Sequence, residues 1–149
     1  MNNVIEGLTI GAGYASAGNT NTSTTSKDTK ESVANVVYSA GPVSVGYRMA
    51  ESNAGGAGTA SRAIDHYSIA FNVNDNLSLS YADAEDTYDA QADASADIAD
   101  VSMDMTSIQA AYSMGAMSIK AYTTEITNPN FDEDAATVTK NEIALGLSF

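Results

Sequence analysis

The stretch Asn141-Glu142-Ile143-Ala144-Leu145-Gly146-Leu147-Ser148-Phe149 ends the sequence and alternates with a period of two. Its odd-numbered positions from 143 onward are apolar, and its even-numbered positions are acidic, small or polar. A strand with this pattern has one apolar face and one polar face. In a soluble protein such a terminal strand is an aggregation hazard, whereas a strand between lipid and a wet interior requires this pattern. The fold class therefore depends on whether the rest of the chain repeats it.

Three compact turn signals divide the chain into repeated hairpins: Gly41-Pro42, Asn74-Asp75-Asn76 and Gly115-Ala116. Each turn follows one alternating segment and precedes another, which is the hairpin pattern. The segments after the turns share the order apolar, Ser, apolar, and this recurrence favours a single architecture throughout. We predict eight strands, at residues 5–17, 31–40, 43–51, 63–73, 77–83, 103–114, 117–126 and 138–149.

The links between these strands are alternately short and long. The long links, at 18–30, 52–62, 83–101 and 127–137, are rich in small, polar or acidic residues. Outer-membrane barrels have short periplasmic turns and long extracellular loops. Counting back from Phe149 places all three short turns on one side, with the start of the first strand, so the strand number is even. The pattern predicts an antiparallel, up-and-down, transmembrane β-barrel.

Composition excludes several other classes of protein. The 149 residues suffice for one domain, and no run approaches the roughly 20 apolar residues of a membrane helix. Without cysteine there is neither a disulfide framework nor a thiolate site, and we predict no cofactor. The net charge of −13 argues against nucleic acid as a partner. The start at Met1 shows no signal peptide, so we expect a mature form or an incomplete piece.

Aromatic residues recur near the turns and on the apolar faces of the predicted strands. Amphipathic rings concentrate at the two interfaces of a membrane, which predicts an aromatic girdle. The alternative explanation is the ordinary preference of Tyr and Phe for strands. The predicted girdle residues are Tyr38, Tyr47, Phe71, Tyr81, Tyr112 and Phe149.

The opposite parity of the strands should line the interior. It holds three of the six basic residues, each of which would cost about 2–4 kcal/mol facing lipid at the midplane. These side chains could form a basic strip that biases ion passage, or be solvated residues paired with carboxylates. His66 is the only histidine, and no metal site or catalytic grouping is predicted from it. The predicted pore-lining residues are Arg48, His66, Gln109, Lys120, Lys140 and Glu142.

An acidic stretch runs from Asp83 to Asp104 without a basic residue. Its alanine content and acid spacing would let part of it form a helix. One interpretation is a divalent-cation site that bridges lipopolysaccharide phosphates, and the other is a solvated surface loop. The same alternatives apply to Asp132-Glu133-Asp134, and acidic rims would raise the local cation concentration at a channel mouth.

The hairpin style, the Gly/Ala/Ser-rich interior faces and the terminal Phe149 together resemble the general, trimeric porins of Gram-negative outer membranes. The resemblance implies a homotrimer embedded in outer-membrane lipid and lipopolysaccharide, which passes ions and small hydrophilic solutes by passive diffusion. It also implies that the barrel-assembly machinery reads Phe149. Such porins have about 16 strands, so the chain is expected to be the C-terminal half of a longer barrel.

Other functions remain open from the sequence. One is a complete eight-stranded barrel that acts as a membrane anchor or adhesin through its loops. Another is a soluble, secreted β-sandwich with an acidic surface. We do not expect an enzyme, because no nucleophile–base pair stands out.

Overall fold

The computed structural model describes residues 5–18, 28–55, 59–92 and 100–148. These residues form one sheet of eight antiparallel strands in the order β1-β2-β3-β4-β5-β6-β7-β8. A 3-10 helix, η1 (Pro129–Phe131), lies between the last two strands. The strands are β1 (Leu8–Ala17), β2 (Thr29–Ala40), β3 (Val43–Asn53), β4 (Thr59–Asn72), β5 (Leu77–Ala92), β6 (Val101–Met114), β7 (Met117–Thr127) and β8 (Val138–Leu147).

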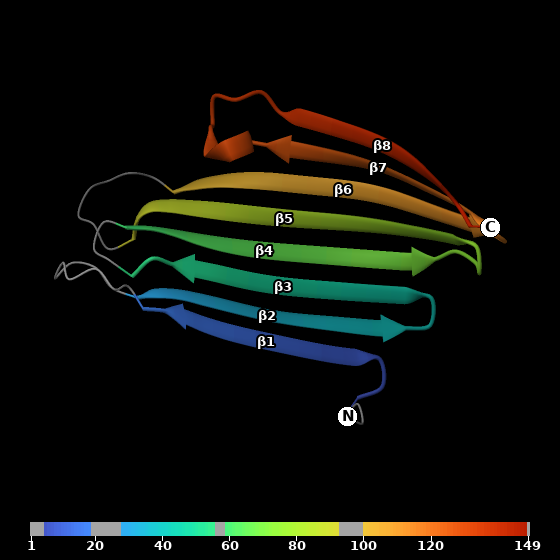
Figure 1. Ribbon diagram of the computed structural model, residues 1–149, viewed down its shortest axis with the longest axis horizontal. Coiled ribbons are helices and arrows are strands. Elements are labelled where there is room, and N and C mark those ends of the chain that lie inside the picture. The colour runs from blue at the N-terminus through green and yellow to red at the C-terminus, as the bar shows by residue number, and fades with distance from the viewer. Residues whose placement is uncertain (1–4, 19–27, 56–58, 93–99, 149) are drawn as a thin grey trace.

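The strands follow one another up and down, as the alternation of links predicts. The three short turns connect the strands at one end of the sheet, which we call the turn end, and β1 begins and β8 ends there (Figure 1). Gly41 and Gly115 have positive φ angles of 56° and 58° in two of these turns, a conformation that glycine adopts without steric cost. The long connections join the strands at the opposite end of the sheet, which we call the loop end.

The sheet is curved but not closed (Figure 1). Within the described residues β1 pairs only with β2, and β8 pairs only with β7. The prediction of an all-β, antiparallel, up-and-down arrangement is confirmed, whereas these eight strands do not by themselves form a closed barrel.

Several strands are longer than the sequence predicts. The largest difference is in β5, which continues to Ala92, so the first half of the predicted acidic loop is strand rather than loop or helix. Strand pairing explains this difference. Tyr88 lies opposite Arg62 of β4, and Asp86 lies opposite Ile64, so the hydrogen-bonded ladder continues through residues of low strand propensity. The residues 93–99 lie outside the described part of the chain.

The sheet has no apolar core. No hydrophobic side chain of the described residues is buried, and the most buried polar side chains are Asp86 and Ser107. Large apolar residues are instead exposed, with Ile143 at 79% and Leu147 at 64% of their full exposure. No helix among the described residues is long and apolar enough to cross a membrane. Whatever covers the apolar side chains lies outside these eight strands.

Candidate functional site: the two faces of the sheet

The strand register assigns the predicted site residues to two opposite faces. Residues directly opposite in neighbouring strands share a face, and successive residues in one strand alternate between faces. We call the side that holds Tyr38, Tyr47, Phe71, Tyr81 and Tyr112 the aromatic face. The other side is the basic face, and it holds Arg48, His66, Gln109, Lys120, Lys140 and Glu142. Every described member of each predicted set therefore lies on one face, while Phe149 lies outside the described residues.

The aromatic face carries an apolar band at the turn end. In β3 the band covers Val43 to Met49, seven residues, and at about 3.4 Å per residue this is roughly 20 Å along the strand. Outer-membrane barrels show an apolar band about 25 Å tall crossed by strands tilted by about 35–45°, so these seven residues would span only part of such a band. The band residues with marked exposure are Ile10, Val36, Val45, Met49, Ile69, Leu79, Ile108, Ile119, Ile143, Leu145 and Leu147.

Tyrosines mark the boundary of the band toward the loop end. Tyr47 and Tyr67 are directly opposite, with ring centroids 4.8 Å apart. The Tyr47 hydroxyl donates a hydrogen bond to Asp65, and the Tyr81 hydroxyl donates one to Asp83 at 3.3 Å. The rings thus lie against the apolar band, and the hydroxyls donate hydrogen bonds to carboxylates on its loop-end side. Tyrosines at a membrane interface have this orientation. Tyr67, which is not among the predicted girdle residues, belongs to this boundary as the direct partner of Tyr47.

Beyond these tyrosines the aromatic face becomes acidic. Asp65, Glu85 and Asp104 form one straight row across β4, β5 and β6, while Asp83 and Glu125 already lie in the row of Tyr67 itself. Like charges directly opposite one another destabilise a sheet, so this row favours a well-solvated position over an apolar one. No group of three or more described His, Asp or Glu side chains has a metal-binding arrangement.

The predicted pore-lining residues fall into two groups on the basic face. Arg48 and His66 are directly opposite in β3 and β4. The others lie in β6, β7 and β8, where Lys140 is 3.7 Å from Glu142 and the Tyr122 hydroxyl donates to Glu142 at 2.7 Å. Small side chains of β5 separate the groups, so the residues do not form one continuous strip.

Charge is divided unequally between the two faces. Of the five basic residues that the structure describes, Lys30 is on the aromatic face and Arg48, Arg62, Lys120 and Lys140 are on the basic face. Neither Arg48 nor Lys120 has an ion-pair partner within the described ranges. Small residues keep this face open: a Cβ on Gly46 would lie 2.8 Å from the Ser68 hydroxyl oxygen, and one on Gly146 would lie 2.6 Å from that of Ser118.

The basic face carries a second, unpredicted cluster at the loop end. The Arg62 guanidinium forms two hydrogen bonds with Asp86, one of them from Nε to Oδ1 at 2.6 Å. Phe131 of η1 packs on both Arg62 and Tyr88, which are directly opposite in β4 and β5. Asp86 and Tyr88 are neighbours on one face of β5, the register of β4 and β5 brings Arg62 beside them, and η1 adds Phe131.

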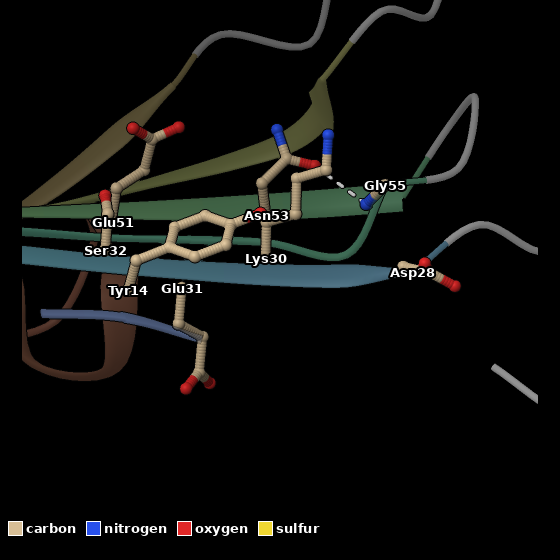
Figure 2. A pocket seen from close by; sticks show the side chains of 8 residues that line it. All are labelled: Tyr14, Asp28, Lys30, Glu31, Ser32, Glu51, Asn53 and Gly55. Carbon is tan, nitrogen blue, oxygen red and sulfur yellow. Dashed lines mark hydrogen bonds between the residues drawn. The ribbon is translucent and has the colours of Figure 1, made fainter. Parts of the chain in front are cut away.

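A polar hollow of roughly 640 Å³ lies at the loop end of β1, β2 and β3. Figure 2 shows the Tyr14 ring beside Lys30 and Asn53, with Glu51 above Ser32. The Asn53 side-chain oxygen accepts a hydrogen bond from the Gly55 backbone N–H at 2.7 Å. The hollow borders the open edge of β1, so an additional strand at that edge would change its shape.

Neither the models of known protein families nor the curated proteins match the chain. The geometry of the two faces is therefore what indicates the function. Its main elements are an exposed apolar band with interfacial tyrosines on one side and a polar wall with basic residues on the other.

Proposed function

We propose that the sheet is part of the wall of an outer-membrane porin, with the aromatic face toward lipid and the basic face toward a water-filled channel. The observation that carries this proposal is the exposed apolar band. The described residues bury no apolar side chain that could form an alternative core. Soluble monomers rarely expose an apolar patch larger than about 300–600 Å². Lipid is the covering that suits a band of limited height bordered by tyrosine hydroxyls.

The two open edges bear on the size of the barrel. Every backbone polar group in the hydrocarbon layer needs a partner, so β1 and β8 each require a neighbouring strand. We propose that further strands complete a barrel of about 16, wide enough for an aqueous channel. A complete eight-stranded barrel would need β1 to pair with β8 and would leave an interior filled by side chains.

The channel we propose passes ions and small hydrophilic solutes by passive diffusion, without a catalytic cycle. Arg48, His66, Lys120 and Gln109 would line its wall, and their charges would set the local field that ions meet. In this proposal the barrel assembles as a homotrimer in the outer membrane, where its outer side contacts lipid and lipopolysaccharide, and the assembly machinery binds Phe149.

Tryptophan fluorescence tests the assignment of the faces, because the chain contains no tryptophan. Leu145→Trp and Ala144→Trp place a single reporter at adjacent positions of β8 on opposite faces. In vesicles, we expect lipids brominated on their acyl chains to quench the fluorescence of the Leu145→Trp variant, and aqueous iodide to quench that of Ala144→Trp. Equal quenching of both variants by brominated lipid would contradict the proposal. Single-channel recording in planar bilayers tests the pore, and a complete absence of open steps would contradict it.

A further inference from the structure

The connection between β7 and β8 is folded back across the sheet. The Asn128 side-chain amide donates to the Ser102 carbonyl of β6 at 3.0 Å. The Phe131 ring centroid is 5.4 Å from that of Tyr88 in β5 and 5.3 Å from the Cζ atom of Arg62 in β4. The connection therefore lies beside β6, and the Phe131 ring reaches the side chains of Tyr88 and Arg62 beyond that strand.

These contacts place the connection on the basic face. Arg62 and Tyr88 are direct cross-strand partners on that face, and Asp86 is two residues from Tyr88 on the same side. The Asp86 side chain is only 10% exposed, and it fixes the guanidinium on which Phe131 lies. A cation held in place by a carboxylate is a well-oriented partner for an aromatic ring. Phe131 is therefore anchored on a preformed platform.

The backbone of the connection is bent into an unfavourable conformation. Asn128, Asn130 and Phe131 all have positive φ angles, of 50°, 61° and 61°. Asparagine tolerates this region, but a bulky residue such as phenylalanine rarely adopts it. Such residues cost on the order of 1–3 kcal/mol each and persist where surrounding contacts fix them. The contacts of Phe131 with Arg62 and Tyr88, together with the hydrogen bond from Asn128 to Ser102, hold this turn in place.

Three exposed carboxylates follow the anchored residue. Asp132, Glu133 and Asp134 lie in a turn in which the Asp134 N–H donates to the Asp132 carboxylate at 3.1 Å. The Ala135 N–H donates to the Asp132 carbonyl, also at 3.1 Å. The acidic run is therefore held in a defined turn beside the anchor, at the loop end of the sheet.

We infer that residues 128–134 form a fixed constriction at the loop-end mouth of the channel, with Phe131 as its anchor and with carboxylates that select against anions. This inference rests on the proposed function, because the basic face must be the channel wall. In a barrel that face points inward, so a connection whose Phe131 side chain packs on it narrows the opening. The carboxylates meet a solute before the basic residues Arg48 and Lys120 do, so the mouth disfavours multivalent anions.

The first experiment tests the fold-back independently of any channel. The chain has no cysteine, so Phe131→Cys combined with Tyr88→Cys gives a single possible disulfide. We expect mild oxidation of the membrane-inserted protein to cross-link this pair. The matched control combines Phe131→Cys with Tyr14→Cys, which lies on the aromatic face of β1, and we expect no cross-link. Failure of the first pair to cross-link, or equal cross-linking of both pairs, would overturn the inference.

The second experiment tests the constriction itself. In planar bilayers, we expect Phe131→Ala to raise the single-channel conductance and to admit larger polyethylene glycols. Ile5→Ala, an exposed apolar residue before β1, is the control and should conduct like the unmodified chain. The triple change Asp132→Asn, Glu133→Gln and Asp134→Asn should shift the reversal potential toward anions without changing the size limit. A conducting chain whose Phe131→Ala variant behaves like the unmodified one overturns the constriction alone. A chain that cross-links but opens no channel overturns the proposed function, and the constriction with it.

Discussion

The turn-end half and the loop-end half of the strands use the two faces of the sheet in opposite ways. In β5, Leu79 and Tyr81 make the aromatic face apolar near the turns, while Asp83 and Glu85 make the same face acidic farther along. On the basic face of the same hairpin, small serine and alanine side chains lie at the turn end. The large side chains of Arg62 and Tyr88, covered by Phe131, lie at the loop end.

This difference shows that strand parity alone does not decide what surrounds a side chain. A soluble sandwich keeps one face of each sheet apolar along its whole length, because the second sheet covers all of it. Here the apolar side chains of the aromatic face give way to acidic ones near Tyr47, Tyr67 and Tyr81, which lie in two adjacent cross-strand rows. The proposed lipid layer, with water beyond it, would produce such a limit.

The largest expected effect comes from a charge in the middle of the apolar band. Leu79→Arg would place a cation within the apolar band, the side proposed to face lipid, whereas Ser80→Arg would place it on the basic face one residue away. We expect Leu79→Arg to lower the free energy of unfolding by about 2–4 kcal/mol, and Ser80→Arg to lower it far less. Urea titration of the protein in lipid vesicles measures both. A Leu79→Arg variant as stable as Ser80→Arg would mean that the band does not face oil.

Two adjacent acids at the loop end should respond in opposite directions. Asp86 holds Arg62, so Asp86→Asn should lower the free energy of unfolding by about 1–2 kcal/mol, given that Arg62 is half exposed. Glu85 lies directly between Asp65 and Asp104 on the aromatic face, so Glu85→Gln should raise it by roughly 0.2–1 kcal/mol at low salt.

Salt provides the control for this pair of variants. The gain from Glu85→Gln arises from repulsion between solvated carboxylates, so it should disappear in about 1 M salt, where the screening length is about 3 Å. The loss from Asp86→Asn should persist, because Asp86 is shielded and bonded directly to Arg62. If both variants changed the free energy of unfolding in the same direction, the two faces would be equally solvated at the level of Glu85 and Asp86.

The sequence was sufficient to predict the faces and most of the strands. The two-residue period in Val43–Tyr47 and Ile143–Leu147 determines which side chains share a side, and the structure confirms this register. The sequence was misleading at Asp83–Ala92, because aspartate and alanine have low strand propensity and their spacing favours a helix or a loop. Pairing with β4 supplies the backbone hydrogen bonds that override this local preference.

The loop-end cluster could not be predicted in the same way. Arg62 and Asp86 lie far from the turn in the two arms of the β4–β5 hairpin, Phe131 lies in the connection after β7, and no periodicity relates them. Their meeting depends on the register of β4 with β5 and on a turn whose φ values are unusual for the residue types present. Likewise, alternation specifies the two sides of a strand but not whether the first and last strands of a sheet find partners.

The smallest predicted effect tests the boundary between the two halves. The Tyr47 ring packs against Tyr67 at the upper limit of the band, and its hydroxyl donates to Asp65. Tyr47→Phe removes the hydrogen bond but keeps the ring, so we expect a loss of about 0.5–1.5 kcal/mol in the free energy of unfolding. The same variant in detergent micelles, where no ordered headgroup layer exists, should lose a similar amount if Asp65 is the main partner. A loss confined to lipid vesicles would instead identify the headgroups as the partner and would place the water boundary below Asp65 rather than at it.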